Sequence, residues 1–349
     1  MDTRPLYRAH GRSLTALHSD LESYALSQPL VFVGTAGSVI ERTNASGFCF
    51  YAHQYYDGDG KKRERYLAGP VGASEAETTA ETMRARILEL KELVPSLRLL
   101  GREGFNLVDS KTYATLASLH NHGVFGAGGM LIGSHAYGVL LNRLGVRAAA
   151  YATEDIDIAR REALALKALP KGGFLQLLRD SGIAFVEVPD LDRRKPATSF
   201  KQVGRSRFHV DLLVPSRDES FPTVRVPELA AYATGMPYLA YLLAESQLAM
   251  LAAREGACAV RVPLPERFAI HKLIVSRLRT GRDAKAQKDM HQAAVLCAVL
   301  ADSHPGALEA ARAKVPARAK KYLAAALRMV LPLLRVHPRA LEELGLANS

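Results

Sequence analysis

The chain has 349 residues, of which 48% are hydrophobic and 23% charged, the composition of a folded protein with a substantial core. Its formal net charge of +11 favours polyanionic partners such as nucleic acid or nucleotide phosphates, although a basic surface without a ligand would have the same composition. No apolar run approaches the roughly 18 residues that a membrane span requires, and the first residues lack the pattern of a signal peptide, so we expect no membrane partner.

The three cysteines, Cys49, Cys258 and Cys297, are far apart and form no Cys-x-x-Cys pair. An odd number of isolated cysteines argues against a disulfide framework and against a zinc knuckle. We therefore expect a protein of the reducing cytoplasm.

Residues 1–104 are predicted to form a small N-terminal unit of antiparallel sheet and helix. After a helical lead-in over 1–28, three segments have the composition of strands, namely GSVIER, GFCFYAHQYY and KKRERYLAG. The sequence DGDG between the last two supplies the residues of a tight hairpin turn. A long amphipathic helix follows over 73–94, with Ser74 as its expected N-cap.

Residues 105–264 are predicted to form a central unit of mixed sheet and helices. In chain order we expect a helix (110–121), an apolar strand ending at Gly133, a helix (135–144), a strand around Asp155, a helix (173–182), a strand (183–189), an antiparallel pair turning at Gly204, and short strands within 238–262. Beyond Pro265 the sequence is helical throughout, which predicts a C-terminal helical bundle over 265–349. The predicted fold class is therefore α+β.

Three carboxylates are candidates for one metal site. Asp155 and Asp157 are two residues apart on a strand, so their side chains point to the same face. Asp211 lies in the apolar stretch SRFHVDLLVPS, where a carboxylate needs a partner or a metal ion. Three carboxylates on adjacent strands would hold two Mg²⁺ ions about 4 Å apart, the arrangement used for in-line nucleotidyl transfer. For each aspartate alone, a turn cap or an ion pair with Arg205 or Arg207 is the simpler explanation.

A phosphate-binding element precedes the paired aspartates. In GMLIGSHAYGVLLNRLG an apolar strand runs into Gly133 and Ser134, and a helix starts at once. Glycine lets the backbone approach a phosphate closely, and the serine hydroxyl and the N–H groups of the helix N-terminus can bind it. His135, the next residue, faces either the triphosphate or the interior of the first helical turn.

The order Gly133-Ser134, Asp155-x-Asp157, Asp211 resembles the nucleotidyltransferase superfamily with the polymerase-β-like fold. More closely, the sequence is similar to the bacterial GSLR-type nucleotidyltransferases, which are related to the AbiEii and MenT toxin nucleotidyltransferases of toxin–antitoxin and phage-defence systems. The resemblance covers residues 125–300 and implies a core of mixed sheet flanked by helices. A longer loop, GVRAAAYAT, follows the helix here than in compact members of the superfamily.

The toxin group has a second signature, a helix with a lysine followed by an aspartate one helix later. Lys272 in RFAIHKLIVSRLR and Asp289 in AKAQKDMHQAAVL match it, whereas His135 stands where the group has leucine. Lys272 lies on one helical stripe, formed by Phe268, Lys272, Val275 and Arg279, and a lysine there usually reaches an anionic group. A side chain that snorkels to solvent, or an ion pair of Asp289 with a neighbouring lysine, would explain the same residues.

The resemblance implies an enzyme that transfers an NMP from an NTP to an acceptor hydroxyl and releases pyrophosphate. It implies metal ligands at Asp155, Asp157 and Asp211, nucleotide contacts at Gly133, Ser134, His135 and Lys272, and a supporting role for Asp289. The net charge and the toxin resemblance favour the 3′ end of an RNA such as tRNA as acceptor, with an antitoxin protein as a further partner. The alternatives are a protein or small-molecule acceptor, or a non-catalytic nucleic-acid-binding protein of the same fold.

Two basic stretches are candidates for nucleic-acid contact. The sequence YYDGDGKKRERY interleaves aromatic and basic residues, as RNA-binding surfaces do. From Glu266 onward the chain carries 15 Lys and Arg residues against 7 Asp and Glu. Either stretch would equally serve as a charged surface that keeps the protein soluble.

Overall fold

A computed structural model describes residues 5–149, 153–166, 171–190, 192, 194–278 and 283–346. The fold is mixed α+β, as predicted, with a mixed sheet flanked by helices. No helix in the described ranges is long and apolar enough to cross a membrane.

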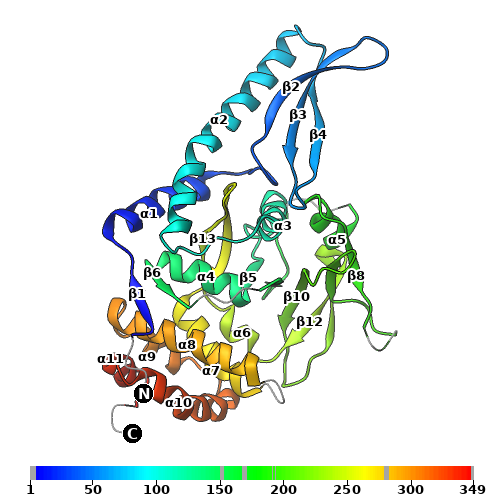
Figure 1. Cartoon of the computed structure of the whole chain (residues 1–349). Coiled ribbons are helices and arrows are strands. Elements are labelled where there is room, and N and C mark those ends of the chain that lie inside the picture. The colour runs from blue at the N-terminus through cyan, green and yellow to red at the C-terminus, as the bar shows by residue number, and fades with distance from the viewer. Residues whose placement is uncertain are drawn as a thin grey trace.

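The N-terminal region is an antiparallel sheet covered by a long helix. The strands are β2 (Ser38–Thr43), β3 (Cys49–Tyr56) and β4 (Lys62–Ala68), paired in the order β2-β3-β4, and the DGDG turn joins the last two as predicted. Helix α2 (Ser74–Arg102) packs on this sheet and runs from it toward the centre of the molecule, where it meets α1 (Arg12–Ser27) (Figure 1).

The N-terminus of α2 is stabilised differently from the prediction. Ser74 is the first helical residue, and the N-cap is Ala73, which makes no side-chain cap hydrogen bond. The Glu77 carboxylate accepts a hydrogen bond from the backbone N–H of Gly72 at 2.8 Å and another from the Tyr51 hydroxyl at 2.8 Å. An acidic side chain in the first turn also complements the helix dipole, so this end needs no serine cap.

Helix α2 also continues past its predicted end, through Pro95 to Arg102. Proline lacks an N–H donor and normally ends or kinks a helix. Leu97 and Leu100, which are 1% and 0% exposed, pack with Phe105 and residues of α1 in one hydrophobic cluster. Their burial offsets the hydrogen bond lost at the proline.

The central sheet holds seven strands of the described residues. Its main order is β11-β12-β10-β7-β5, formed by β11 (Thr223–Val226), β12 (Ala231–Met236), β10 (His209–Pro215), β7 (Asp155–Ala159) and β5 (Met130–Ile132). Strand β10 is parallel to both β7 and β12, whereas β5 and β11 are antiparallel to their neighbours. The first half of β10 also pairs antiparallel with β9 (Ser199–Gln202), as predicted across Gly204, and β9 pairs with β8 (Phe185–Val188).

Helices and a hairpin surround this sheet, at the predicted places. They are α3 (Ser110–Asn121), α4 (Gly133–Arg143), α5 (Gly173–Arg179) and the antiparallel pair of β13 (Ser246–Ala252) and β14 (Ala257–Pro263). Helix α4 follows β5 without a loop and packs against β5, β7 and β14. Because β5 and β7 are neighbours, the start of α4 lies beside the strand that carries the paired aspartates.

Several short elements were not predicted. Strand β1 (Tyr7–Ala9) lies within the predicted helical lead-in and pairs antiparallel with β6 (Val146–Ala148), which lies within the predicted loop GVRAAAYAT. Strands β11 and β12, the 3₁₀ turn η1 (Pro227–Leu229) and α6 (Leu239–Leu242) were also missed. All of these except β12, which has six residues, have three or four residues, too few to establish a hydrophobic period.

The C-terminal region is helical, as predicted. Its elements are α7 (Pro265–Leu278), α8 (Asp283–Ser303), α9 (Ala307–Ala313), the 3₁₀ turn η2 (Ala317–Ala319), α10 (Lys320–Leu334) and α11 (Pro338–Glu343). This region and the β2–β4 sheet lie at opposite ends of the molecule (Figure 1).

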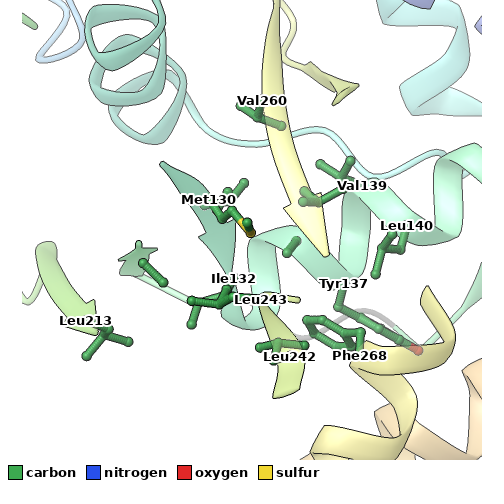
Figure 2. Packing of buried hydrophobic residues seen from close by; sticks show 14 of the residues in the cluster. Met130, Ile132, Tyr137, Val139, Leu140, Leu213, Leu242, Leu243, Val260 and Phe268 are labelled. Carbon is green, nitrogen blue, oxygen red and sulfur yellow. The ribbon is translucent and has the colours of Figure 1, made fainter. Parts of the chain in front are cut away.

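One continuous hydrophobic core joins the central sheet to the C-terminal helices. Figure 2 shows its side chains meeting from β5 (Ile132), α4 (Tyr137), α6 (Leu242) and α7 (Phe268). Helix α7 is therefore fixed against the strands that bear the aspartates. The domain limits at 104 and 264 stay predictions.

Candidate active site

The three predicted carboxylates lie on neighbouring strands at one level of the sheet. In the parallel register of β7 and β10, Asp157 is opposite Asp211 and Asp155 is opposite His209. Alternate residues of a strand share a face, so all three carboxylates point to the same face. The isoleucines that follow Asp155 and Asp157 are 0% and 1% exposed, which fixes β7 in the core.

Gly133 leaves the space that the Asp157 carboxylate occupies. The residue before it, Ile132, pairs with Asp157, and Gly133 itself has φ of +69°. A Cβ at this position would lie 2.0 Å from Asp157 Oδ2, far closer than non-bonded atoms approach. Glycine is therefore required both for its backbone conformation and for the close approach of the carboxylate. Ser134 follows, half-buried in the first turn of α4.

The carboxylates differ in their electrostatic environment. Burial and, after it, the negative charges of Asp211 and Asp155 together raise the pKa of Asp157 to about 6. Burial also disfavours the ionised form of Asp211, but hydrogen bonds from His209 and Ser199 outweigh it and lower the pKa of Asp211. Asp157 and Asp211 therefore differ in the direction of their pKa shifts although they face each other across the two strands.

His209 and Ser199 are site residues that were not predicted. His209 Nδ1 lies 3.3 Å from Asp155 Oδ1, and its Nε2 lies 3.5 Å from Asp211 Oδ2. The hydrogen bond to Asp211 is the main cause that raises the pKa of His209 to about 9, so its imidazolium lies between two carboxylates. On β9, Ser199 pairs with Asp211, and its hydroxyl donates to Asp211 Oδ1.

A sequence signal existed for one of these two residues. His209 is two residues before Asp211 on a strand, and that spacing places it on the same face. Ser199 had no such signal, because its position depends on the register between β9 and β10. The alternative ion pair of Asp211 with an arginine that precedes β10 is not formed among the described residues.

Lys272 and Asp289 form a buried ion pair between α7 and α8. Lys272 Nζ donates to Asp289 Oδ1 at 2.6 Å, and the two residues are 8% and 3% exposed. The alternative of a lysine that snorkels to solvent is therefore wrong, and Lys272 is a partner of Asp289. Arg279, the last member of the predicted stripe, lies outside the described residues.

A cavity of about 460 Å³ lies beside the aspartates. Gly133, Asp157 and Lys272 line it together with His271, so both charges of the site reach its wall. The rest of the wall is largely apolar and comes from β10, β12, α6 and α7, with residues such as Leu213, Met236, Leu242 and Phe268. A cavity of this size accepts a small organic ligand, here with charged groups at one end and an apolar surface at the other.

His135 lies apart from this cavity. It is 9% exposed in the first turn of α4, and it does not line the cavity wall. Burial lowers the pKa of His135 to about 4, while the charges of Asp109 and Asp155 oppose the shift. Its Nε2 has no hydrogen-bond partner among the described residues. Direct contact of His135 with a nucleotide in the cavity therefore has no support from the geometry.

The donor set suits a hard divalent cation. Carboxylate oxygens are the preferred ligands of Mg²⁺. The pKa of Asp157 is raised by burial and by the nearby negative charges, and a bound cation would offset both effects. Within the described ranges, however, no group of three or more His, Cys, Asp or Glu side chains is already arranged around a metal position. His209 lies between Asp155 and Asp211, and its imidazolium supplies positive charge to both carboxylates.

Comparison with known families gives a match to a model described as nucleotidyltransferase, over residues 110–316. This range covers more than half of the chain, from α3 to the end of α9, and includes all the site residues above. No curated protein and no solved structure matches the chain. Nucleotidyltransferases generally act on nucleoside triphosphates with a divalent metal ion, which agrees with the carboxylates and the charged cavity. The chain therefore belongs to the nucleotidyltransferase family and is an enzyme of that class.

Proposed function

We propose that the protein is a Mg²⁺-dependent enzyme that transfers an NMP from an NTP to the 3′ hydroxyl of an RNA. The observation that carries the proposal is the register of β7 and β10, in which Asp157 faces Asp211 beside a cavity that Lys272 also lines. Asp157 and Lys272 at the cavity wall, with the Asp211 carboxylate on the neighbouring strand, can bind the opposite charges of a metal–triphosphate complex.

The aspartates are proposed as the metal ligands. Asp155 and Asp157 would hold two Mg²⁺ ions and Asp211 one of them. The bound ions would neutralise charge on the phosphates and orient the reacting oxygens. Ser199 and His209 hold Asp211 in its ionised form, and this carboxylate would accept the proton of the attacking hydroxyl.

The remaining residues are proposed to bind the triphosphate. Ser134 and the N-terminus of α4 would contact the β- and γ-phosphates, because helix N-termini bind anions. Lys272 would neutralise the charge that develops on the leaving pyrophosphate, and Asp289 would hold its ammonium group in place. The acceptor oxygen then forms a bond to the α-phosphorus as the bond to the β-phosphate bridging oxygen breaks, and pyrophosphate leaves.

The RNA acceptor is proposed from charge and from resemblance. A net charge of +11 suits a polyanionic acceptor. The Lys272–Asp289 signature resembles the AbiEii and MenT toxin nucleotidyltransferases, and we accordingly propose tRNA as the RNA and an antitoxin protein as the restraining partner. The proposed cytoplasmic location rests on the three isolated cysteines.

The test is to incubate the protein with each α-labelled NTP, Mg²⁺ and total RNA, and to ask which species gains label. Label in a band of tRNA size supports the proposal. Label only in protein bands would replace it with protein nucleotidylation, and label only in small molecules would replace it with a small-molecule acceptor. RNA binding without any labelled species would favour a non-catalytic binding protein.

A further inference from the structure

A second cavity, of about 1160 Å³, lies outside the site described above. It is formed by the C-terminal part of α2, the segment that leads into α3, and the turn between β13 and β14. Three arginines line it: Arg98 and Arg102 from α2, and Arg254 from the turn. We call this cavity the arginine cleft.

The three arginines are available to a ligand. Arg98 and Arg102 are four residues apart in a helix, so they share one face, and Arg254 comes from a separate element. All three are exposed, and within the described residues none of them forms an ion pair. Exposed guanidinium groups that converge on one cavity without carboxylate partners suit phosphates, which they bind through paired N–H donors.

The acidic residues of the cleft do not cancel this charge. Asp109 is the N-cap of α3, and its carboxylate accepts hydrogen bonds from the backbone N–H groups of Lys111 and Thr112 and from the Thr112 hydroxyl. Asp109 and Glu255 together carry two negative charges against the three arginines, so the cleft keeps a net positive charge.

The arginine cleft is separate from the nucleotide cavity. The two cavities share no lining residue. Asp109, at the wall of the cleft, and Asp155 both lie close enough to His135 for their charges to act on it. In-line transfer requires the acceptor and the leaving pyrophosphate to be on opposite sides of the α-phosphorus, so an acceptor strand needs a binding surface separate from the nucleotide cavity.

We propose that the arginine cleft binds the phosphate backbone of the RNA acceptor strand, so that Arg98, Arg102 and Arg254 determine acceptor affinity. This inference rests on the proposed function for the identity of the acceptor. The arginines touch neither the nucleotide cavity nor the aspartates, so they act on acceptor binding alone.

The test compares Arg98→Ala/Arg102→Ala/Arg254→Ala with a control that removes three other exposed positive charges outside both basic stretches, Lys171→Ala/Arg217→Ala/Arg225→Ala. RNA affinity is measured by fluorescence anisotropy across a salt series, and transfer by label incorporation at varied RNA and NTP concentrations. We expect the cleft variant to lose on the order of 10- to 100-fold in RNA affinity and about 2 units of salt slope, since each single-strand phosphate contact contributes about 0.7. The kcat at saturating RNA and the KM for NTP should stay as in the wild type.

Several outcomes would overturn the inference. They are an unchanged RNA affinity in the cleft variant, an equal loss in the control variant, or no RNA binding by the wild type. If the wild type binds RNA through the arginines but labels none, the proposed function fails and the binding site stands. A variant with Arg→Lys at the three positions guards against misfolding, since it keeps the charge and should keep the salt slope.

Discussion

At the scale of single residues, Gly133 brings the backbone close to the carboxylate of Asp157, a proposed metal ligand. Replacing it with alanine adds a Cβ 2.0 Å from Asp157 Oδ2 in a backbone with φ of +69°. The carboxylate must move, and a displacement of about 1 Å in a catalytic group costs on the order of 100-fold in rate. We expect Gly133→Ala to lower kcat for label transfer by at least that factor.

Gly138 in the same helix provides the matched control for this change. An alanine there would place its Cβ 3.2 Å from Asn106 Cβ, away from the aspartates. We expect Gly138→Ala to keep kcat within a few-fold of wild type, because the neighbouring side chain needs to move only by tenths of an ångström. Equal activity in the two variants would contradict the proposed role of Gly133.

His135 makes stability depend on pH. Its pKa is lowered to about 4 in the folded protein against 6.5 for an unperturbed histidine, so between these values the unfolded chain binds more protons. The stability associated with neutral, buried His135 is fully present above pH 6.5. As pH falls toward 4, the free energy of unfolding decreases by up to about 1.4 kcal/mol per pH unit. Denaturant unfolding of wild type and His135→Gln at pH 7.5 and 5.5 measures it. An identical pH dependence in both proteins would refute the assignment.

At the scale of elements, the Lys272–Asp289 pair connects α7 to α8. Lys272→Met leaves the Asp289 carboxylate buried without its lysine, and Asp289→Leu leaves the Lys272 ammonium group buried without its carboxylate. Each change should therefore cost about 3–5 kcal/mol of unfolding free energy. The double variant should recover much of that stability, since two apolar side chains replace a buried pair. Lys272→Met and the double variant should lose label transfer because the phosphates lose their lysine, and Asp289→Leu should lower it because the ammonium group of Lys272 loses the carboxylate that holds it in place.

A purely structural pair would give a different result. In that case the double variant would regain transfer activity together with its stability. Replacing the exposed pair Arg42 and Glu64 is the control, and it should change stability and activity little.

The elements that could be predicted from the sequence are those with a long run of periodic hydrophobic residues or a strong turn signal. The strand pair across Gly204, the hairpin at DGDG and the C-terminal helices are of this kind. The pairing of β1 with β6 joins segments more than a hundred residues apart through three residues each, and no local pattern encodes it. The extension of α2 past Pro95 likewise depends on tertiary burial of Leu97 and Leu100, which overrides the local preference.

The site residues that could be predicted are those whose motifs follow one another along the sequence in a recognisable order. The sequence predicts that the Gly-Ser turn and the three aspartates lie close together, because carboxylates in apolar strands need a shared partner. The contributions of Ser199 and His209 depend on the register of β9 and β7 with β10, which only the assembled sheet reveals. The arginine cleft could not be predicted from the sequence either, because it is formed by α2 and a turn about 150 residues later in the chain.

At the scale of the whole molecule, nucleotide binding should stabilise the fold. The cavity is walled by the central sheet and by α7, so a Mg²⁺–NTP complex would hold the two together. A ligand at 100 times its Kd adds about 2.7 kcal/mol, which should raise Tm by several degrees for a non-hydrolysable NTP with Mg²⁺. EDTA should remove the effect, and an unchanged Tm at saturating ligand would argue against binding in this cavity.

The most direct test of the account is label transfer from an α-labelled NTP by wild type, Asp157→Asn and Asp211→Asn, with the exposed Asp20→Asn as a control. We predict that the two site variants remain folded, with circular dichroism like that of the wild type, and transfer no label, while Asp20→Asn transfers label at the wild-type rate. Transfer by either folded site variant would contradict the proposed metal ligands and with them the proposed catalytic centre.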